Sequence, residues 1–259
     1  MKQRTSSSSR RATKHSDAQV SMKVINVGVI GAGRIGIVHL EALASCPDAR
    51  PIIISNPTAS KAEAAAAKFN VPHFTGDAME VINHPEVDAV WICSPSQYHA
   101  EQIKACAAAG KHIFCEKPIA TDMAETIEAI NACKEAGVKL MTALQRRFDP
   151  NFARVKKAIA DGEVGDVVQV KLCSRDPSPP PLEYVKGGGG IFKDMAVHDL
   201  DMSRFLMGSE PQVSPAHARL LALRSVVFTP LAVTRAAPSY LMTQSPHRSK
   251  TLPLYASKV

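Results

Sequence analysis

Residues 24–36 read VINVGVIGAGRIG, a short apolar run followed at once by three glycines in the spacing G-x-G-x-x-G. The apolar run predicts a buried β-strand, and the residues after it predict a helix. In such a unit Gly31 permits the tight turn, Gly33 lets the backbone approach a pyrophosphate, and Gly36 lets helix and strand pack closely. The amides at the start of the helix would hold the anion. The residues predicted to bind a dinucleotide here are Gly31, Gly33, Arg34, Ile35 and Gly36.

The chain downstream alternates between short apolar runs and helical stretches of about a dozen residues. This alternation predicts right-handed βαβ units and a parallel sheet with helices on both faces. The fold class is therefore α/β, with an N-terminal Rossmann-type parallel sheet over residues 23–145. The predicted strands span 24–30, 51–55, 89–93, 112–116 and 138–143, and the predicted helices span 34–46, 59–68, 98–109 and 122–136.

The residues after the second predicted strand bear on cofactor choice. An acidic residue about 20 positions beyond the glycines commonly binds the ribose 2′-hydroxyl of NAD. Ser55 and Asn56 occupy that place here, and neither side chain repels a 2′-phosphate, while Lys61 lies nearby in sequence. NAD is the expected cofactor, with Asn56 among its binding residues, and NADP stays possible.

A second module is predicted to begin after residue 145, as an incomplete α+β substrate domain over 146–212. Its first part reads as a helix over 150–165 and a Val-rich strand over 166–174. A loop rich in proline and glycine follows and leads toward another helix. This order of elements differs from the βαβ alternation before it, which favours a separate domain.

The stretch GGGGIFKDMAVHDLDM, residues 187–202, predicts a helix that carries Asp194 and His198 one turn apart on one face. A carboxylate in that place can orient an imidazole, so the pair is a candidate proton-transfer site. A capped helix with an ordinary exposed pair would show the same spacing. Asp199 and Asp201 are expected to be surface or capping residues.

Five motifs in order carry a resemblance to a known family: GAGRIG, CSPSQYHAEQI (93–103), CEKP (115–118), LQRRFDPNF (144–152) and the Asp-His stretch. Together they resemble the glucose-fructose oxidoreductase and inositol dehydrogenase (Gfo/Idh/MocA) family, most of all its myo-inositol 2-dehydrogenase branch. The resemblance runs from about residue 23 to 212.

The resemblance implies a role for each matching residue. Lys117 would contact the reacting hydroxyl, Asp194 would steady the site, and His198 would accept the hydroxyl proton. Glu116 would border the nicotinamide ribose. Further cofactor residues would be Ser94, Pro95 and His99, and the candidates for substrate contact are Arg146 and Arg175.

The implied activity is NAD(P)-dependent oxidation of a secondary hydroxyl of a cyclic polyol or sugar, inositol-like in kind. Its chemistry agrees with these residue types, because a histidine suits proton removal near neutral pH and a lysine cation favours a developing alkoxide. No metal is expected. The expected partner is this small molecule, and neither nucleic acid nor membrane.

The two ends of the chain differ from the rest. The net charge of +7 arises at residues 1–22, a Ser- and Arg-rich arm expected to be disordered, and at the C-terminal tail. Import into an organelle is an alternative reading of the arm. The tail, 213–259, has no acidic residue and no recognised strand pattern, and is expected to be aberrant or disordered.

The tail raises a rival hypothesis. If the second domain is truncated, the chain would be a catalytically inactive nucleotide-binding fragment, because a lone strand cannot form a stable sheet. The homo-oligomer implied by the resemblance would then be doubtful. The six cysteines form no C-x-x-C pair and are expected to be buried, reduced thiols in a cytoplasmic protein. No apolar run reaches the length of a membrane span.

Overall fold

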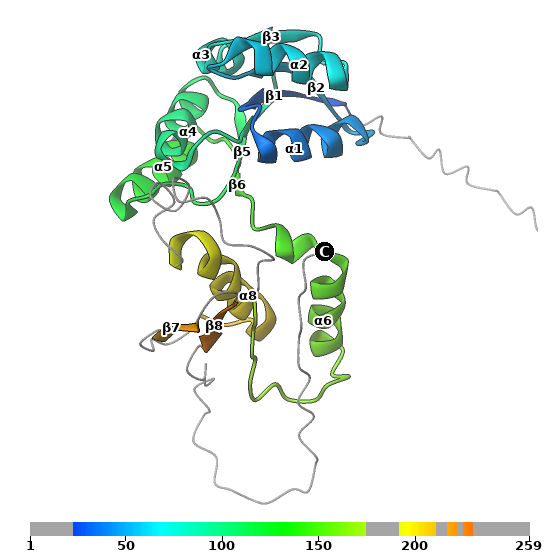
Figure 1. Cartoon of the computed structure of the whole chain (residues 1–259), viewed down its shortest axis with the longest axis vertical. Helices are drawn as coiled ribbons and strands as arrows, with labels where there is room; N and C mark the ends of the chain where they lie inside the picture. The colour runs from blue at the N-terminus through cyan, green and yellow to red at the C-terminus, as the bar shows by residue number, and fades with distance from the viewer. Residues whose placement is uncertain (1–22, 175–191, 211–216, 222–224, 230–259) are drawn as a thin grey trace, which may run out of the picture.

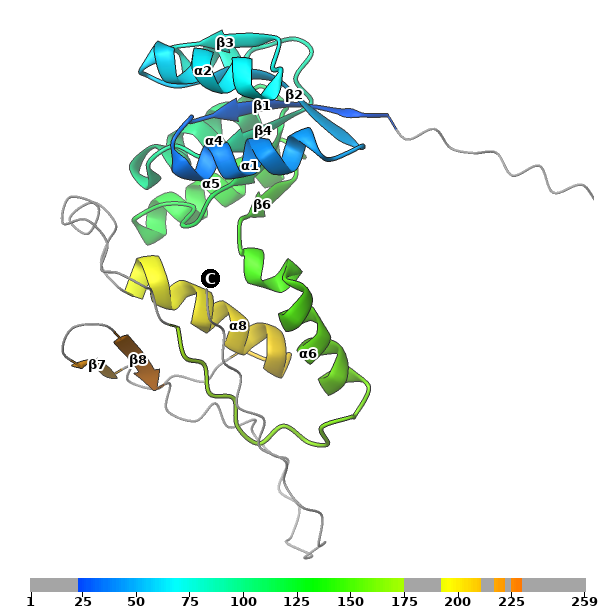
Figure 2. The same cartoon turned by 45° about the vertical axis from the view of Figure 1, so that its right-hand side comes forward.

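The computed structural model describes residues 23–174, 192–210, 217–221 and 225–229. Figure 1 shows two parts joined below strand β6 (Leu140–Thr142). One part is a sheet with helices packed against it. In the other, helices α6 (Pro150–Ala160) and α8 (Val197–Met207) lie side by side, as Figure 2 also shows.

Six parallel strands form the sheet in the order β3-β2-β1-β4-β5-β6. This is the doubly wound order, in which the strand sequence reverses between β1 and β4 and opens a crevice at the carboxyl ends. The Rossmann-type sheet predicted from the sequence is thus confirmed. The remaining strands are β1 (Ile25–Ile30), β2 (Ala49–Ser55), β3 (His73–Thr75), β4 (Ala89–Ile92) and β5 (His112–Cys115).

Helices cover both faces of the sheet because the central strands are apolar on both sides. Val29 of β1 packs in one buried cluster with Leu40 of α1, and Ile92 of β4 packs in another with Ile103 of α4. The first cluster is completed by α2 and the second by α3 and α5. These helices are α1 (Arg34–Ala44), α2 (Ala59–Phe69), α3 (Ala78–Ile82), α4 (His99–Ala108) and α5 (Met123–Glu135).

Two elements of the sheet domain were not predicted. Strand β3 has three residues and α3 has five, too few for a period of 2.0 or 3.6 to be recognised. The start of α3 has a local signal nevertheless, since the Asp77 carboxylate accepts a hydrogen bond of 2.8 Å from the Met79 amide. That is the usual N-cap arrangement.

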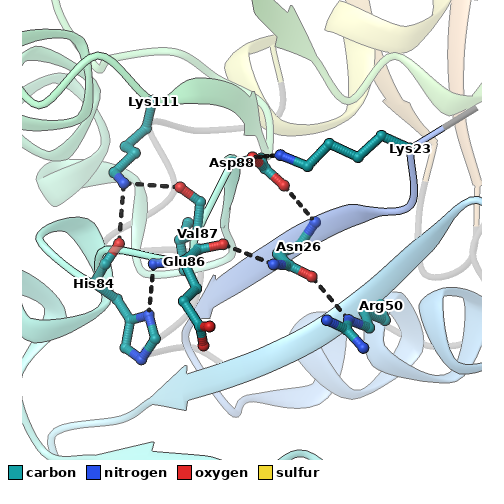
Figure 3. Close-up of polar contacts among 8 residues, drawn as sticks. All are labelled: Lys23, Asn26, Arg50, His84, Glu86, Val87, Asp88 and Lys111. Atoms are coloured by element: carbon teal, nitrogen blue, oxygen red, sulfur yellow. Dashed lines mark hydrogen bonds and ion pairs between the residues drawn. The ribbon is translucent and has the colours of Figure 1, made fainter.

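Polar contacts close the amino-terminal edge of the sheet, opposite the crevice (Figure 3). The Asp88 carboxylate accepts hydrogen bonds from Lys23 Nζ at 2.7 Å and from the Asn26 amide at 2.9 Å. Lys111 Nζ donates to the carbonyls of His84 and Val87. These contacts fix the strand starts, because the carbonyls and the Asn26 amide gain partners in place of water.

The second part begins with a 3-10 turn, η2 (Gln145–Phe148), and continues into α6. Asp149 caps α6 by accepting from the Asn151 amide at 2.8 Å, and Pro150 takes the first helical position. A small apolar core joins this helix to α8. It contains Phe152, Leu172, Met202 and Leu206.

The structure corrects two predictions for this part. Residues 166–174 form no strand, because the described residues offer them no partner strand. Leu172 and Ser174 are buried there all the same. The helix predicted within 187–202 begins as a single π-helical turn, η3 (Phe192–Ala196), and becomes α-helical only from Val197.

The C-terminal segment contains two short strands, although the sequence showed us no strand pattern there. Strands β7 (His217–Leu221) and β8 (Ser225–Thr229) pair antiparallel as a separate two-stranded sheet. Neither HARLL nor SVVFT alternates strictly between polar and apolar residues, so the period of a half-buried strand could not be recognised there.

All six cysteines are free thiols. Four are buried as expected, but Cys46 is exposed and Cys173 is half-buried. Burial raises the pKa of Cys93, Cys115 and Cys133 and raises that of Cys106 to about 12. Among the described helices, none is long and apolar enough to span a bilayer.

Candidate active site

The glycine turn lies at the carboxyl end of β1, where the crevice opens. The Gly31 amide donates to the Ser55 carbonyl at 2.8 Å, which ties the turn to the end of β2. Gly31 has a φ of +106°, and a β-carbon there would lie 2.6 Å from the Cys93 carbonyl oxygen. A β-carbon on Gly36 would overlap the Gly31 carbonyl oxygen. Both glycines are therefore required by the fold itself.

Gly33 is different, because nothing in the fold requires it. Its φ of −78° and ψ of −178° suit any residue, and a β-carbon would meet no atom within 4 Å. The backbone at the start of α1 thus faces open space, with Arg34 and Ile35 exposed beside it. An anionic ligand can come close to the amides of a helix only where the backbone is open in this way.

Asn56 holds the turn from beneath. Its side-chain oxygen accepts from the Ala32 amide at 3.2 Å, and its side-chain nitrogen donates to the Thr58 carbonyl at 3.1 Å. The amide side chain is thus used at both ends by the protein. The structure shows that Asn56 supports the glycine turn, and its predicted contact with the cofactor stays a prediction.

His99 links the two loops that border the crevice. Its Nδ1 lies 2.7 Å from the Pro118 carbonyl oxygen, and its Nε2 lies 2.8 Å from that of Ser94. The imidazole is only 1% exposed, so it lies beneath the cleft and not on its surface. Ser94 is half-buried, and its hydroxyl donates to the Gln102 side chain at 2.6 Å. Pro95, between them in sequence, is exposed.

Glu116 is held by a residue that the sequence reasoning missed. His39 of α1 lies with its Nε2 2.7 Å from Glu116 Oε1, and its ring meets the Phe114 ring edge-on at 5.1 Å. The other carboxylate oxygen, Oε2, accepts from the Lys117 amide at 3.2 Å. The sequence carried a signal for this contact, since His39 lies three residues after the last glycine, on the helix that the turn begins.

Lys117 and Asp194 meet across the two parts of the molecule. Lys117 Nζ donates to Asp194 Oδ1 at 2.7 Å and to the Asp194 carbonyl oxygen at 2.8 Å. Both side chains are largely buried, with exposed fractions of 16% and 30%. Lys193 anchors the same turn by donating to the Thr121 carbonyl at 2.7 Å. The structure therefore brings together two residues 77 positions apart that the motifs had singled out.

His198 lies in the first turn of α8, four residues after Asp194, and is half-buried. The π-helical turn before it carries Asp194 to Lys117, so the carboxylate and the imidazole belong to one short segment at the sheet's carboxyl edge. A lysine cation, a carboxylate and an imidazole on adjoining segments can bind a hydroxyl group and remove its proton.

Asp199 and Asp201 correct our expectation that they lie on the surface. Their side chains are each 6% exposed. Asp199 pairs with Arg146 and also accepts from the Ser174 hydroxyl at 2.7 Å. Asp201 accepts hydrogen bonds from the guanidinium of Arg147. These hydrogen bonds raise the pKa of Arg147 above its ordinary value. Arg175, the other predicted substrate residue, lies outside the described residues.

Family models match most of the chain. Residues 25–144 match the model described as an oxidoreductase family with an NAD-binding Rossmann fold, and residues 152–228 match the GFO/IDH/MocA C-terminal domain. The chain belongs to the Gfo/Idh/MocA oxidoreductase family. The second match extends to residue 228, beyond the point near Val213 at which we had placed the end of the resemblance.

Curated and solved members of the Gfo/Idh/MocA family match about three quarters of this chain. The inositol 2-dehydrogenase of Rhizobium meliloti is 44% identical over 202 residues, which cover 78% of this chain and 61% of that protein. A probable dehydrogenase from Thermotoga maritima has a TM-score of 0.73 at 41% identity, over 76% of this chain and 60% of that chain.

A structure solved with ligands is also similar. The scyllo-inositol dehydrogenase of Lactobacillus casei, described with bound NAD(H) and scyllo-inositol, has a TM-score of 0.66 at 29% identity, over 72% of this chain and 57% of that chain. The present chain thus spans about three fifths of the length of its curated relatives.

Proposed function

We propose that this chain acts as an NAD-dependent dehydrogenase that oxidises a secondary hydroxyl of a cyclic polyol of the inositol type. The observation that carries the proposal is the contact of Lys117 with Asp194, on the segment that also bears His198, at the carboxyl edge of a Rossmann sheet. The names of the relatives, which include inositol 2-dehydrogenases, support the substrate class.

The glycine turn fits a dinucleotide. Gly33 leaves open the space that a pyrophosphate needs, and the amides that begin α1 face it. Glu116, fixed by His39, would border the nicotinamide ribose. Strand β2 ends at this crevice with two neutral residues, Ser55 and Asn56, and not with a carboxylate that would bind the ribose 2′-hydroxyl. The choice of NAD over NADP therefore rests on the family. When bound, the nicotinamide supplies the hydride acceptor.

The side chains of the chain supply the rest of the chemistry. The Lys117 ammonium favours negative charge developing on the substrate oxygen as its proton leaves. His198, in its neutral form, accepts that proton. Asp194 holds the lysine by two contacts from one residue, so the cation is positioned before substrate arrives.

Turnover by purified protein tests this proposal. With NAD and myo-inositol we expect formation of NADH, seen as absorbance at the nicotinamide band, and we expect Lys117→Met to lower kcat by about a thousandfold while NADH still binds. Lys104→Met is the matched control, because Lys104 is an exposed lysine whose partner is Glu128 at 3.2 Å. Equal activity of the two variants would contradict the assigned role of Lys117.

The rival hypothesis, an inactive nucleotide-binding fragment, predicts NADH binding without turnover of any polyol. It is less favoured because the second family model matches 152–228 and because the contact between Lys117 and Asp194 is formed. We further propose a cytoplasmic location, which the six free thiols support. Sedimentation of the purified chain would measure whether it assembles as a homo-oligomer.

A further inference from the structure

Two consecutive arginines on η2 each bind an aspartate on α8. Arg146 directs one guanidinium nitrogen at Asp199 Oδ1 and another at the Ser174 hydroxyl, 3.0 Å away. The Ser174 hydroxyl in turn donates to Asp199 Oδ1 at 2.7 Å. These three side chains contact one another, so Arg146 holds α8 and the segment that ends at Ser174 together.

Arg147 binds Asp201 with two nitrogens. Its Nε lies 2.9 Å from Oδ2, and its Nη2 lies 2.6 Å from Oδ1. A paired fork of this kind fixes orientation as well as distance, which a lysine cannot do. The Asp201 side chain is only 6% exposed, so Arg147 takes the place of water as its hydrogen-bonding partner.

The two aspartates lie on either side of His198 around the axis of α8. At 3.6 residues per turn, Asp199 and Asp201 are about 160° apart, and His198 falls within that arc. Rotation of the helix in one direction would therefore break the first ion pair, and rotation in the other direction would break the second. The apolar contacts of Met202 and Leu206 lack such directionality.

The arginines also connect this helix to the sheet. Turn η2 begins three residues after the end of β6. Strand β6 pairs with β5, and Lys117 follows the end of β5 in sequence. We propose that Arg146 and Arg147 are positioning residues, a clamp that sets the rotation of α8 and so places His198 against the site of Lys117. The clamp gives Arg146 a role separate from the substrate contact that the resemblance implied, which stays a prediction. As a statement about turnover it rests on the proposed function.

The test uses the full chain and compares ion pairs on one helix. Arg147→Met removes the fork but keeps the stem. Arg204→Met is the matched control, because Arg204 lies on the same helix and pairs with Glu210 beyond the end of that helix, and the two side chains are 46% and 74% exposed. The double reversal Arg147→Asp with Asp201→Arg restores the pair in the opposite sense. Should Arg147→Met fail to fold, Arg147→Lys serves in its place.

We expect Arg147→Met to lower kcat by about a hundredfold, the scale of a displacement near 1 Å, with NADH affinity within about twofold of wild type. The lysine variant should lose about tenfold, since it keeps the charge but not the fork. The reversal should recover at least about tenfold over Arg147→Met. The control should match wild type. Unchanged kcat in Arg147→Met, or an equal loss of NADH affinity and kcat, would overturn the clamp.

A second measurement separates this inference from the proposed function. If wild type turns over no polyol, the proposed function fails, and the clamp is then judged by the imidazole NMR signal of His198 and by amide exchange of α8. The signal is assigned among the nine histidines by its loss in His198→Gln. Both should change in Arg147→Met and not in Arg204→Met. If neither changes, the clamp is wrong even though cofactor binds.

Discussion

Substitution of Gly33 by alanine should weaken cofactor binding at least about tenfold while leaving the fold intact. The other two glycines of the turn are required by backbone geometry, whereas Gly33 has an extended backbone that alanine also adopts. A methyl group there would project into space that contacts no protein atom within 4 Å. If that space belongs to a pyrophosphate, the methyl group costs binding and nothing else.

The expected magnitudes follow from this geometry. Alanine gains about 0.4–1 kcal/mol over glycine by restricting the unfolded chain, and it loses several tenths as an N-cap, so the free energy of unfolding should change by less than about 0.5 kcal/mol. Binding should weaken at least about tenfold, or about 1.4 kcal/mol, because the helix amides could no longer approach the anion.

Two titrations measure the two effects on the same protein. Urea unfolding can be followed by the fluorescence of the single tryptophan, Trp91, which stacks on Phe114 at 4.7 Å in the folded sheet. NADH binding can be followed by the fluorescence of the dinucleotide itself. Both curves are compared with those of wild type at one pH and one salt concentration.

Gly31→Ala provides the contrasting variant. Its φ of +106° and the 2.6 Å approach to a backbone carbonyl should destabilise the fold by about 2 kcal/mol or more. The reasoning is refuted if Gly33→Ala binds NADH as wild type does, or if it loses as much stability as Gly31→Ala. In either case the open space above Gly33 would have no connection with the ligand.

Three further predictions concern other residues. At pH 8 a thiol reagent should modify exposed Cys46 quickly and Cys106 only after unfolding, because burial raises the pKa of Cys106 to about 12; mass spectrometry of the labelled peptides checks this. The hydrogen bond from Lys23 lowers the pKa of Asp88 below 3.8. The ionised Asp88 should therefore stabilise the fold fully above pH 3.8, and this stabilisation should be lost as the pH falls through the lowered pKa. At such acidic pH the unfolding midpoints of wild type and Asp88→Asn should converge. His39→Leu should weaken NADH binding about threefold to tenfold, because Glu116 loses its partner, while His39→Gln should retain most of the affinity; equal affinities would show that the contact does not matter.

The local parts of the site were accessible from the sequence. The turn at 31–36 and the strands beside it follow from glycine spacing and apolar runs, which are properties of neighbouring residues. The same holds for Lys117, whose place after a strand puts it at the carboxyl edge of any parallel sheet. The structure places the glycine turn and Lys117 at the carboxyl edge of the sheet, as expected, but the sequence did not predict which side chains they contact.

The long-range parts were not accessible. Nothing near Asp199 or Asp201 in sequence indicates that their partners are Arg146 and Arg147, which lie more than fifty residues away. A D-x-D pair on a helix reads as solvated surface until something covers it. In the same way His39 reads as one more residue of an amphipathic helix until Glu116 is placed beside it.

The sequence by itself determined the parallel sheet and the dinucleotide turn, because each depends on short-range patterns. The family resemblance singled out the lysine, aspartate and histidine as predicted site residues. Only the tertiary structure decided which of these side chains meet and what holds them. It paired Lys117 with Asp194 over 77 positions, began the helix of His198 with a π-helical turn, and buried two aspartates against two arginines. The reason is physical: burial removes water from a charge, and its partner must then come from wherever the fold brings one.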